Sequence, residues 1–173
     1  SFTEAGLQIH EDVNIGVAIA LDDGLVAPGI LNCDQKSLAE IAAEIAGPDG
    51  EVWTVAPAFE QSGVAHRISY TQPFMISKIS ERRYAAEGSP ADCVMAGLHE
   101  VLNGKDVDLI LSGVNRGNNS AENALYSGTL GGAMEGALQG IPAFALSQYL
   151  GPDNFRIPEA FDCAATHGAS VIR

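Results

Sequence analysis

Several features that would place a sequence in a simple class are scarce here. The three cysteines, Cys33, Cys93 and Cys163, are far apart and form no Cys-x-x-Cys pair, so neither a disulfide framework nor a zinc cluster is expected. Apolar runs stay below the ~18 residues of a membrane-spanning helix, so no membrane partner is expected. The first residues lack the basic and then apolar pattern of a signal peptide. We therefore predict a reducing, cytoplasmic location.

Lysine and arginine are also scarce. The chain has 9 of them against 22 aspartates and glutamates, which gives a formal net charge of -13 at pH 7. No run of basic residues could follow a phosphate backbone, which argues against binding to a nucleic acid duplex. An acidic surface also repels a nucleotide. A phosphate ester would therefore need a divalent cation nearby, or backbone N–H groups at the start of a helix.

Hydrophobic residues, by contrast, make up 46% of the 173 residues, enough for one domain with its own core. Residues 68–80 alternate like a strand, and residues 25–31 are compatible with a strand or a loop. The stronger patterns predict buried strands at 14–21, 51–56, 108–114 and 143–147, and helices at 37–46, 91–101, 127–140 and from 158 onward. Such alternation is typical of a parallel sheet with right-handed crossovers, so we predict a single α/β domain over residues 1–173.

Polar loops follow three of the predicted strands. Asp22 and Asp23 come directly after the first strand, Ser62 lies in the loop 60–63, and Asn115 lies in the loop 112–119. Ligands of α/β sheets bind at the carboxyl ends of the strands, so these loops are expected to share one edge. Their oxygen atoms suit Mg²⁺, Mn²⁺ or Ca²⁺ better than zinc. Asp-Asp-Gly is equally a good turn sequence, and that alternative stays open.

A fourth segment offers donors to an anion. Ser127, Gly128 and Thr129 open a glycine-rich helix, whose first turn presents free N–H groups. The plainer alternative is an N-capped, tightly packed helix. Arg116 has two interpretations of equal weight: a contact to substrate phosphate, or a surface pair with a glutamate.

Four motifs, in order and in spacing, resemble the SurE family. They are residues 56–64 (APAFEQSGV), 87–94 (EGSPADCV), 111–119 (LSGVNRGNN) and 125–129 (LYSGT), and residues 134–143 continue the match. The resemblance extends from about residue 38 to residue 173. It implies a mostly parallel, Rossmann-like three-layer α/β sandwich, here truncated at the C-terminus.

The resemblance also implies an activity: divalent-metal-dependent hydrolysis of nucleoside 5'-monophosphates to nucleoside and phosphate. It implies one cation per subunit, Mg²⁺ or Mn²⁺, held by Asp22, Asp23, Ser62 and Asn115. Of these, Asp22, Asp23 and Asn115 would be the catalytic residues. The substrate phosphate would lie on Ser127, Gly128 and Thr129, with Arg116 beside it. A homo-oligomer is expected to be weakened by the truncation.

Residues 1–45 resemble a different family, the catalytic domain of dihydrolipoamide acyltransferases. The similarity lies in residues 1–6, 10–20 and 32–42. The His-x-x-x-Asp-Gly motif of that family is absent from the chain. We therefore expect a chimera joined within the helix at 38–46. Two alternatives to an active nucleotidase remain open: an inactive or nucleotide-binding-only chimera, and a fragment of an acyltransferase core.

Overall fold

The computed structural model describes residues 38–148 continuously. It also describes short strand segments at 2–3, 6–7, 15–17, 19–21, 24–26 and 29–30, and residues 169 and 172. The early strands are β1 (Phe2–Thr3), β2 (Gly6–Leu7), β3 (Ile15–Val17), β4 (Ile19–Leu21), β5 (Gly24–Val26) and β6 (Gly29–Ile30). The rest comprises α1 (Leu38–Ala46), β7 (Thr54–Pro57), β8 (Ile76–Ser80), β9 (Arg83–Ala86), α2 (Pro90–Ala96), the π-helical turn η1 (Gly97–Val101), β10 (Ile110–Arg116), the 3-10 helix η2 (Ala121–Tyr126), α3 (Gly128–Leu138) and β11 (Ala143–Gln148).

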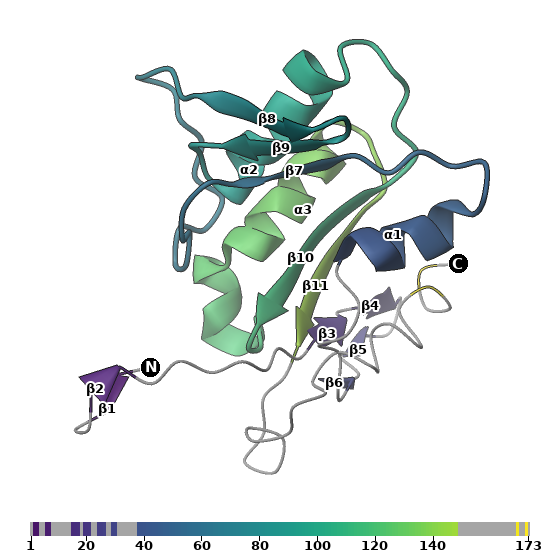
Figure 1. Cartoon of the computed structure of the whole chain (residues 1–173). Helices are drawn as coiled ribbons and strands as arrows, with labels where there is room; N and C mark the ends of the chain where they lie inside the picture. The colour runs from purple at the N-terminus through teal and green to yellow at the C-terminus, as the bar shows by residue number, and fades with distance from the viewer. Residues whose placement is uncertain are drawn as a thin grey trace.

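The described strands form two larger sheets, beside the two-stranded sheets β1-β2 and β4-β5. In the first, β10 pairs in parallel with β11, and β3 and then β6 continue the sheet in the order β10-β11-β3-β6. In the second, of order β7-β9-β8, β7 is parallel to β9 and β8 is antiparallel to it. Helix α3 packs against both β10 and β11, and α1 packs against β10. Figure 1 shows α1 and α3 flanking the β10–β11 pair, which is the layered α/β arrangement that the sequence predicts.

The first predicted strand departs from the expected parallel arrangement. Residues 14–21 contain two short strands, β3 and β4, in place of one long strand. β3 pairs antiparallel with β11, through Val17 and Leu146, and β4 pairs antiparallel with β5, through Leu21 and Gly24. An apolar pattern indicates a buried strand but not the neighbour or direction in which it pairs.

The helices begin where their capping residues stand. Ser89 caps α2 and forms a reciprocal capping box with Asp92, and Pro90 occupies the first turn, where a missing N–H costs nothing. Ser127 caps α3, and its side chain accepts a hydrogen bond from the Leu130 N–H. Helix α1 confirms the predicted helix over 37–46, and its Ile41 is 1% exposed.

Helices α2 and α3 pack against each other and bury several small residues, Ala91, Cys93 and Ala96 in α2 and Ala133 in α3. Burial raises the pKa of the Cys93 thiol to about 12, with a further contribution from the charge of Asp92. Cys93 is therefore a neutral, buried thiol and not a reactive one.

Candidate functional site

Asn115 owes its position to an irregular pairing between β10 and β11. Ser112 pairs with Ala145, but Asn115 pairs with Ser147, so the register shifts between the two positions. Gly113, at the shift, has φ +134, and a Cβ there would collide with the carbonyl oxygen of Leu146. Glycine is the residue that allows the two strands to meet at this point.

The amide of Asn115 is oriented by its own loop. Its Nδ2 donates a hydrogen bond of 2.9 Å to the carbonyl oxygen of Gly117. With that donor engaged, Oδ1 is the side-chain atom that remains to coordinate a cation or accept a hydrogen bond. Arg116 follows in β10, but its side chain lies outside the described part of the structure.

Ser127, a predicted phosphate contact at the start of α3, has a structural role as the cap of that helix. Ser127 is buried, and its Oγ accepts a hydrogen bond of 3.1 Å from the Leu130 N–H, so this oxygen serves the helix cap. Gly128 and Thr129 occupy the first turn, where backbone N–H groups have no acceptor within the helix. These N–H groups, at the positive end of the helix dipole, are the donors available to an anion.

The loop that carries Ser62 lies against the start of α3. A Cβ at Gly128 would lie 3.0 Å from Val64 Cγ2 and 3.3 Å from the Gln61 carbonyl oxygen, so the absent side chain is what admits the loop. Ser62 is exposed, and its hydroxyl donates a hydrogen bond to the carboxylate of Glu60. The structure thereby associates a third carboxylate, Glu60, with the predicted site. The sequence signal for Glu60 is that it lies two residues before Ser62.

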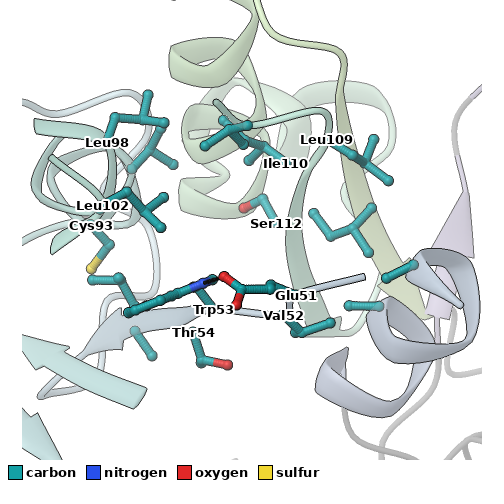
Figure 2. A pocket seen from close by; sticks show the side chains of 18 of the residues that line it. Glu51, Val52, Trp53, Thr54, Cys93, Leu98, Leu102, Leu109, Ile110 and Ser112 are labelled. Atoms are coloured by element: carbon teal, nitrogen blue, oxygen red, sulfur yellow. Dashed lines mark hydrogen bonds between the residues drawn. The ribbon is translucent and has the colours of Figure 1, made fainter. Parts of the chain in front are cut away.

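A cavity of about 1010 Å³ brings two of the predicted site residues together. Its lining includes Asn115 and Thr129, together with Ser112, and it does not include Ser62. Figure 2 shows Ser112 facing the interior of this cavity, with Trp53 among the side chains opposite. The wall is largely apolar, and β7 and β10, the end strands of the two sheets, both contribute to it. Asn115 and Thr129 therefore border the same space.

Charged residues gather around Trp53 at the same cavity. Glu51 accepts hydrogen bonds from Lys105 Nζ at 3.0 Å, Arg82 Nη2 at 2.8 Å and Trp53 Nε1 at 3.2 Å. The hydrogen bond from Lys105 is the main cause of the lowered pKa of Glu51, and the hydrogen bond from Trp53 and the positive charge of the nearby Arg82 lower it further. The Lys105 ammonium also lies 4.8 Å from the Trp53 ring centroid. Both cations are thus paired with a carboxylate, and as exposed pairs they stabilise the fold little.

The remaining predicted ligands, Asp22 and Asp23, lie outside the described residues. Within the described part of the chain, no group of three or more His, Cys, Asp or Glu side chains could hold a metal ion. The described candidates, Ser62 and Asn115, supply neutral oxygen atoms of the kind that hard divalent cations accept. Their chemistry fits such a cation provided that carboxylates elsewhere in the chain supply the negative charge. In the same described part, no helix has the length and apolar character needed to cross a membrane.

Comparisons with known proteins agree on one family. The model of the family described as "Survival protein SurE" matches residues 17–173. The chain is 65% identical over 157 residues to a protein named 5'-nucleotidase SurE of Cereibacter sphaeroides (strain KD131 / KCTC 12085), which covers 91% of this chain and 58% of the relative. It is 63% identical, with the same coverage, to the protein of that name from Ruegeria pomeroyi. The chain thus spans less than two thirds of these curated relatives.

A solved structure supports the same fold. The crystal structure of the SurE protein from Aquifex aeolicus aligns with a TM-score of 0.65 and 38% sequence identity, and covers 79% of this chain and 54% of that chain. Because the identity is well above the level at which only the fold is shared, the alignment agrees with the family match. It also confirms the predicted fold class.

The comparisons correct the expected boundary and the expected chimera. The family match begins at residue 17, not near residue 38, so it includes most of the segment that resembles an acyltransferase. Identity of 65% to the Cereibacter sphaeroides protein extends over 157 residues, or 91% of the chain. The findings therefore give no support to a chimera or to a fragment of an acyltransferase core.

Proposed function

The chain belongs to the SurE family, and from this premise we propose that it is a divalent-metal-dependent phosphomonoesterase that hydrolyses nucleoside 5'-monophosphates. The similar proteins of known name are 5'-nucleotidases. The observation that carries the proposal is the shared cavity, in which Asn115 from β10 and Thr129 from α3 line one space. A phosphate monoester bound in this cavity would lie near Asn115, the proposed cation ligand, and near the N–H groups at the start of α3, the proposed donors to the phosphate.

The first turn of α3 binds the phosphate in this proposal. The N–H groups of Gly128 and Thr129 and the hydroxyl of Thr129 donate to the phosphoryl oxygens, and the helix dipole favours their negative charge. Ser127 caps the helix and thereby stabilises the first turn that carries these donors. As charge spreads over the equatorial oxygens in the transition state, fixed donors stabilise it without reorganisation. Arg116 is proposed to add a contact to the same phosphate.

We assign the divalent cation, Mg²⁺ or Mn²⁺, to Asp22, Asp23, Ser62 and Asn115. When bound, such a cation polarises a phosphoryl oxygen and lowers the pKa of a coordinated water. Asn115 would contribute Oδ1, which its bond to the Gly117 carbonyl leaves available. Asp22 and Asp23 would supply the negative charge that the neutral oxygens lack.

Phosphate release from a panel of nucleoside 5'-monophosphates tests the proposal, first with Mg²⁺ or Mn²⁺ and then with EDTA. We expect release that requires the metal, and a loss of at least about a hundredfold in Asp23→Asn, since the substitution removes a charged ligand. The matched control is Asp12→Asn, because residue 12 lies before the family match. This variant should retain activity. Nucleotide binding without any metal-dependent release would favour the alternative, a binding-only domain. Full activity in Asp23→Asn would refute the metal assignment.

Two further assignments follow from the same proposal. We place the protein in the cytoplasm, a setting consistent with Cys93 as a free, buried thiol. We also propose a homo-oligomer, since large apolar side chains are exposed on and before β8.

A further inference from the structure

The loop of residues 60–66 is attached to α3 by a contact that sequence reasoning did not assign. His66 Nε2 lies 2.8 Å from Glu135 Oε2, across 69 positions of sequence. Glu135 is in the third turn of α3, and its side chain is 8% exposed, against 26% for His66. The second oxygen of the carboxylate accepts a hydrogen bond of 2.8 Å from Gln139 Nε2. Both oxygens of a buried carboxylate are therefore bonded, one of them by the loop.

Glycines of α3 let the loop lie directly on the helix. A Cβ at Gly131, one turn before Glu135, would lie 2.5 Å from the Ala65 carbonyl oxygen and 2.9 Å from the His66 Cα. The Ala65 N–H donates a hydrogen bond of 3.0 Å to the Tyr126 carbonyl oxygen, just before the α3 cap. The loop is thus held at two points, beside the first turn of α3 and beside its third.

We propose that His66 and Glu135 are positioning residues, which fix the loop carrying Ser62 against the helix whose first turn carries Gly128 and Thr129. This inference rests on the proposed function, because it links the cation side of the site to the phosphate side. His66 lies four positions after Ser62, so its hydrogen bond to Glu135 limits where the Ser62 hydroxyl can lie. Without the pair, Glu135 would remain buried with one oxygen unbonded, which disfavours the docked loop.

Contacts beyond residues 60–66 explain why the hydrogen bond between His66 and Glu135 affects that loop specifically. The Ser69 N–H and hydroxyl donate to the carboxylate of Asp92 in α2, both at 2.8 Å. The chain after His66 is therefore fastened independently to another helix. Loss of the His66 contact should loosen residues 60–66, with the Ala65 hydrogen bond to Tyr126 still in place, while residues 69 onward keep their position.

Two measurements on the full chain test the proposal: amide hydrogen exchange over residues 60–66, and Mn²⁺ affinity measured without nucleotide. In His66→Ala we expect faster exchange in that loop and about a tenfold weaker Mn²⁺ affinity, the usual effect of losing a group that orients a ligand. His66→Gln keeps an N–H donor of similar reach and should restore both values. His99→Ala, at an exposed histidine, is the matched control and should change neither.

The outcomes separate this inference from the proposed function. Unchanged exchange over residues 60–66 in folded His66→Ala overturns the positioning role, whatever the activity. If the wild-type chain binds no Mn²⁺, the cation assignment fails, and exchange alone decides the role of His66. Should His66→Ala fail to fold, His66→Asn decides in its place, because a shorter polar side chain at this partly exposed position cannot reach Glu135. Faster loop exchange in that variant supports the proposal, and wild-type exchange overturns it.

Discussion

At the scale of single residues, Gly113 shows how one missing side chain shapes the site. It combines φ +134 with a backbone oxygen, that of Leu146, in the place where a Cβ would stand. Gly104 has φ +90 but nothing within 4 Å of its Cβ position. Substitution of the two glycines therefore separates two costs. A side chain at Gly104 meets backbone strain alone, and a side chain at Gly113 meets strain and a steric collision.

Gly113→Ala should therefore destabilise the protein far more than Gly104→Ala. Backbone strain alone costs about 1–3 kcal/mol, which is our expectation for Gly104→Ala. In Gly113→Ala the strands must also move apart, so we expect a loss of about 4 kcal/mol or more. Urea unfolding of both variants measures the difference. Equal losses would mean that the collision with Leu146 is relieved without cost.

At the scale of elements, helix α2 depends on one buried carboxylate. Asp92 is 2% exposed and closes the capping box by accepting a hydrogen bond of 2.8 Å from the Ser89 N–H. It also accepts both hydrogen bonds from Ser69. Burial acts to raise the pKa of Asp92, but the hydrogen bonds from Ser69 and Ser89 outweigh it, and the pKa is lowered.

A lowered folded-state pKa makes the stability of this element depend on pH. The ionised Asp92 stabilises the fold above its ordinary pKa of 3.8, and this contribution is lost as pH falls through the lower folded-state pKa. Asp92→Asn should lose about 2 kcal/mol at pH 7 and show a shallower decline on acidification. Unfolding free energies at pH 7 and at about pH 3 measure both effects. The exposed Asp49→Asn is the control, and a decline as steep in Asp92→Asn as in the wild type would contradict the assignment.

At the scale of the whole molecule, several exposed apolar side chains lie on β8 or shortly before it in the chain. Tyr70 is 87% exposed, Met75 62% and Ile79 66%. Leu138, at the end of α3, is 72% exposed but belongs to a different element. Large apolar side chains exposed to this extent are typical of a surface that associates with another protein.

The double variant Tyr70→Ser, Ile79→Thr should therefore reduce self-association, because it removes apolar area that association would bury. Sedimentation velocity over a range of protein concentrations measures the change. Leu138→Ser removes a similarly exposed apolar side chain elsewhere and should leave the proposed self-association unchanged. If both variants sediment like the wild type, the surface near β8 is not the interface.

Much of the fold was predictable from local patterns. The apolar periodicity of residues 37–46 predicts α1, and the small-residue helix predicted at 127–140 is α3, with Ser127 as its cap. The strand-like pattern at 68–80 proved too long, since β8 occupies only Ile76–Ser80, and β9 was missed because Arg83–Ala86 has no apolar alternation. The predicted helix at 91–101 continues beyond α2 as a π-helical turn.

Local motifs were enough to identify the family and to predict the residue types of the site, because motifs, caps and periodicity are properties of neighbouring residues. The antiparallel pairing of β3 with β11, the cavity shared by Asn115 and Thr129, and the contact between Glu135 and His66 became visible in three dimensions alone. Each of these joins residues far apart in the chain. Such contacts depend on which apolar surfaces are buried together and which buried charges need partners, and no local pattern records that choice.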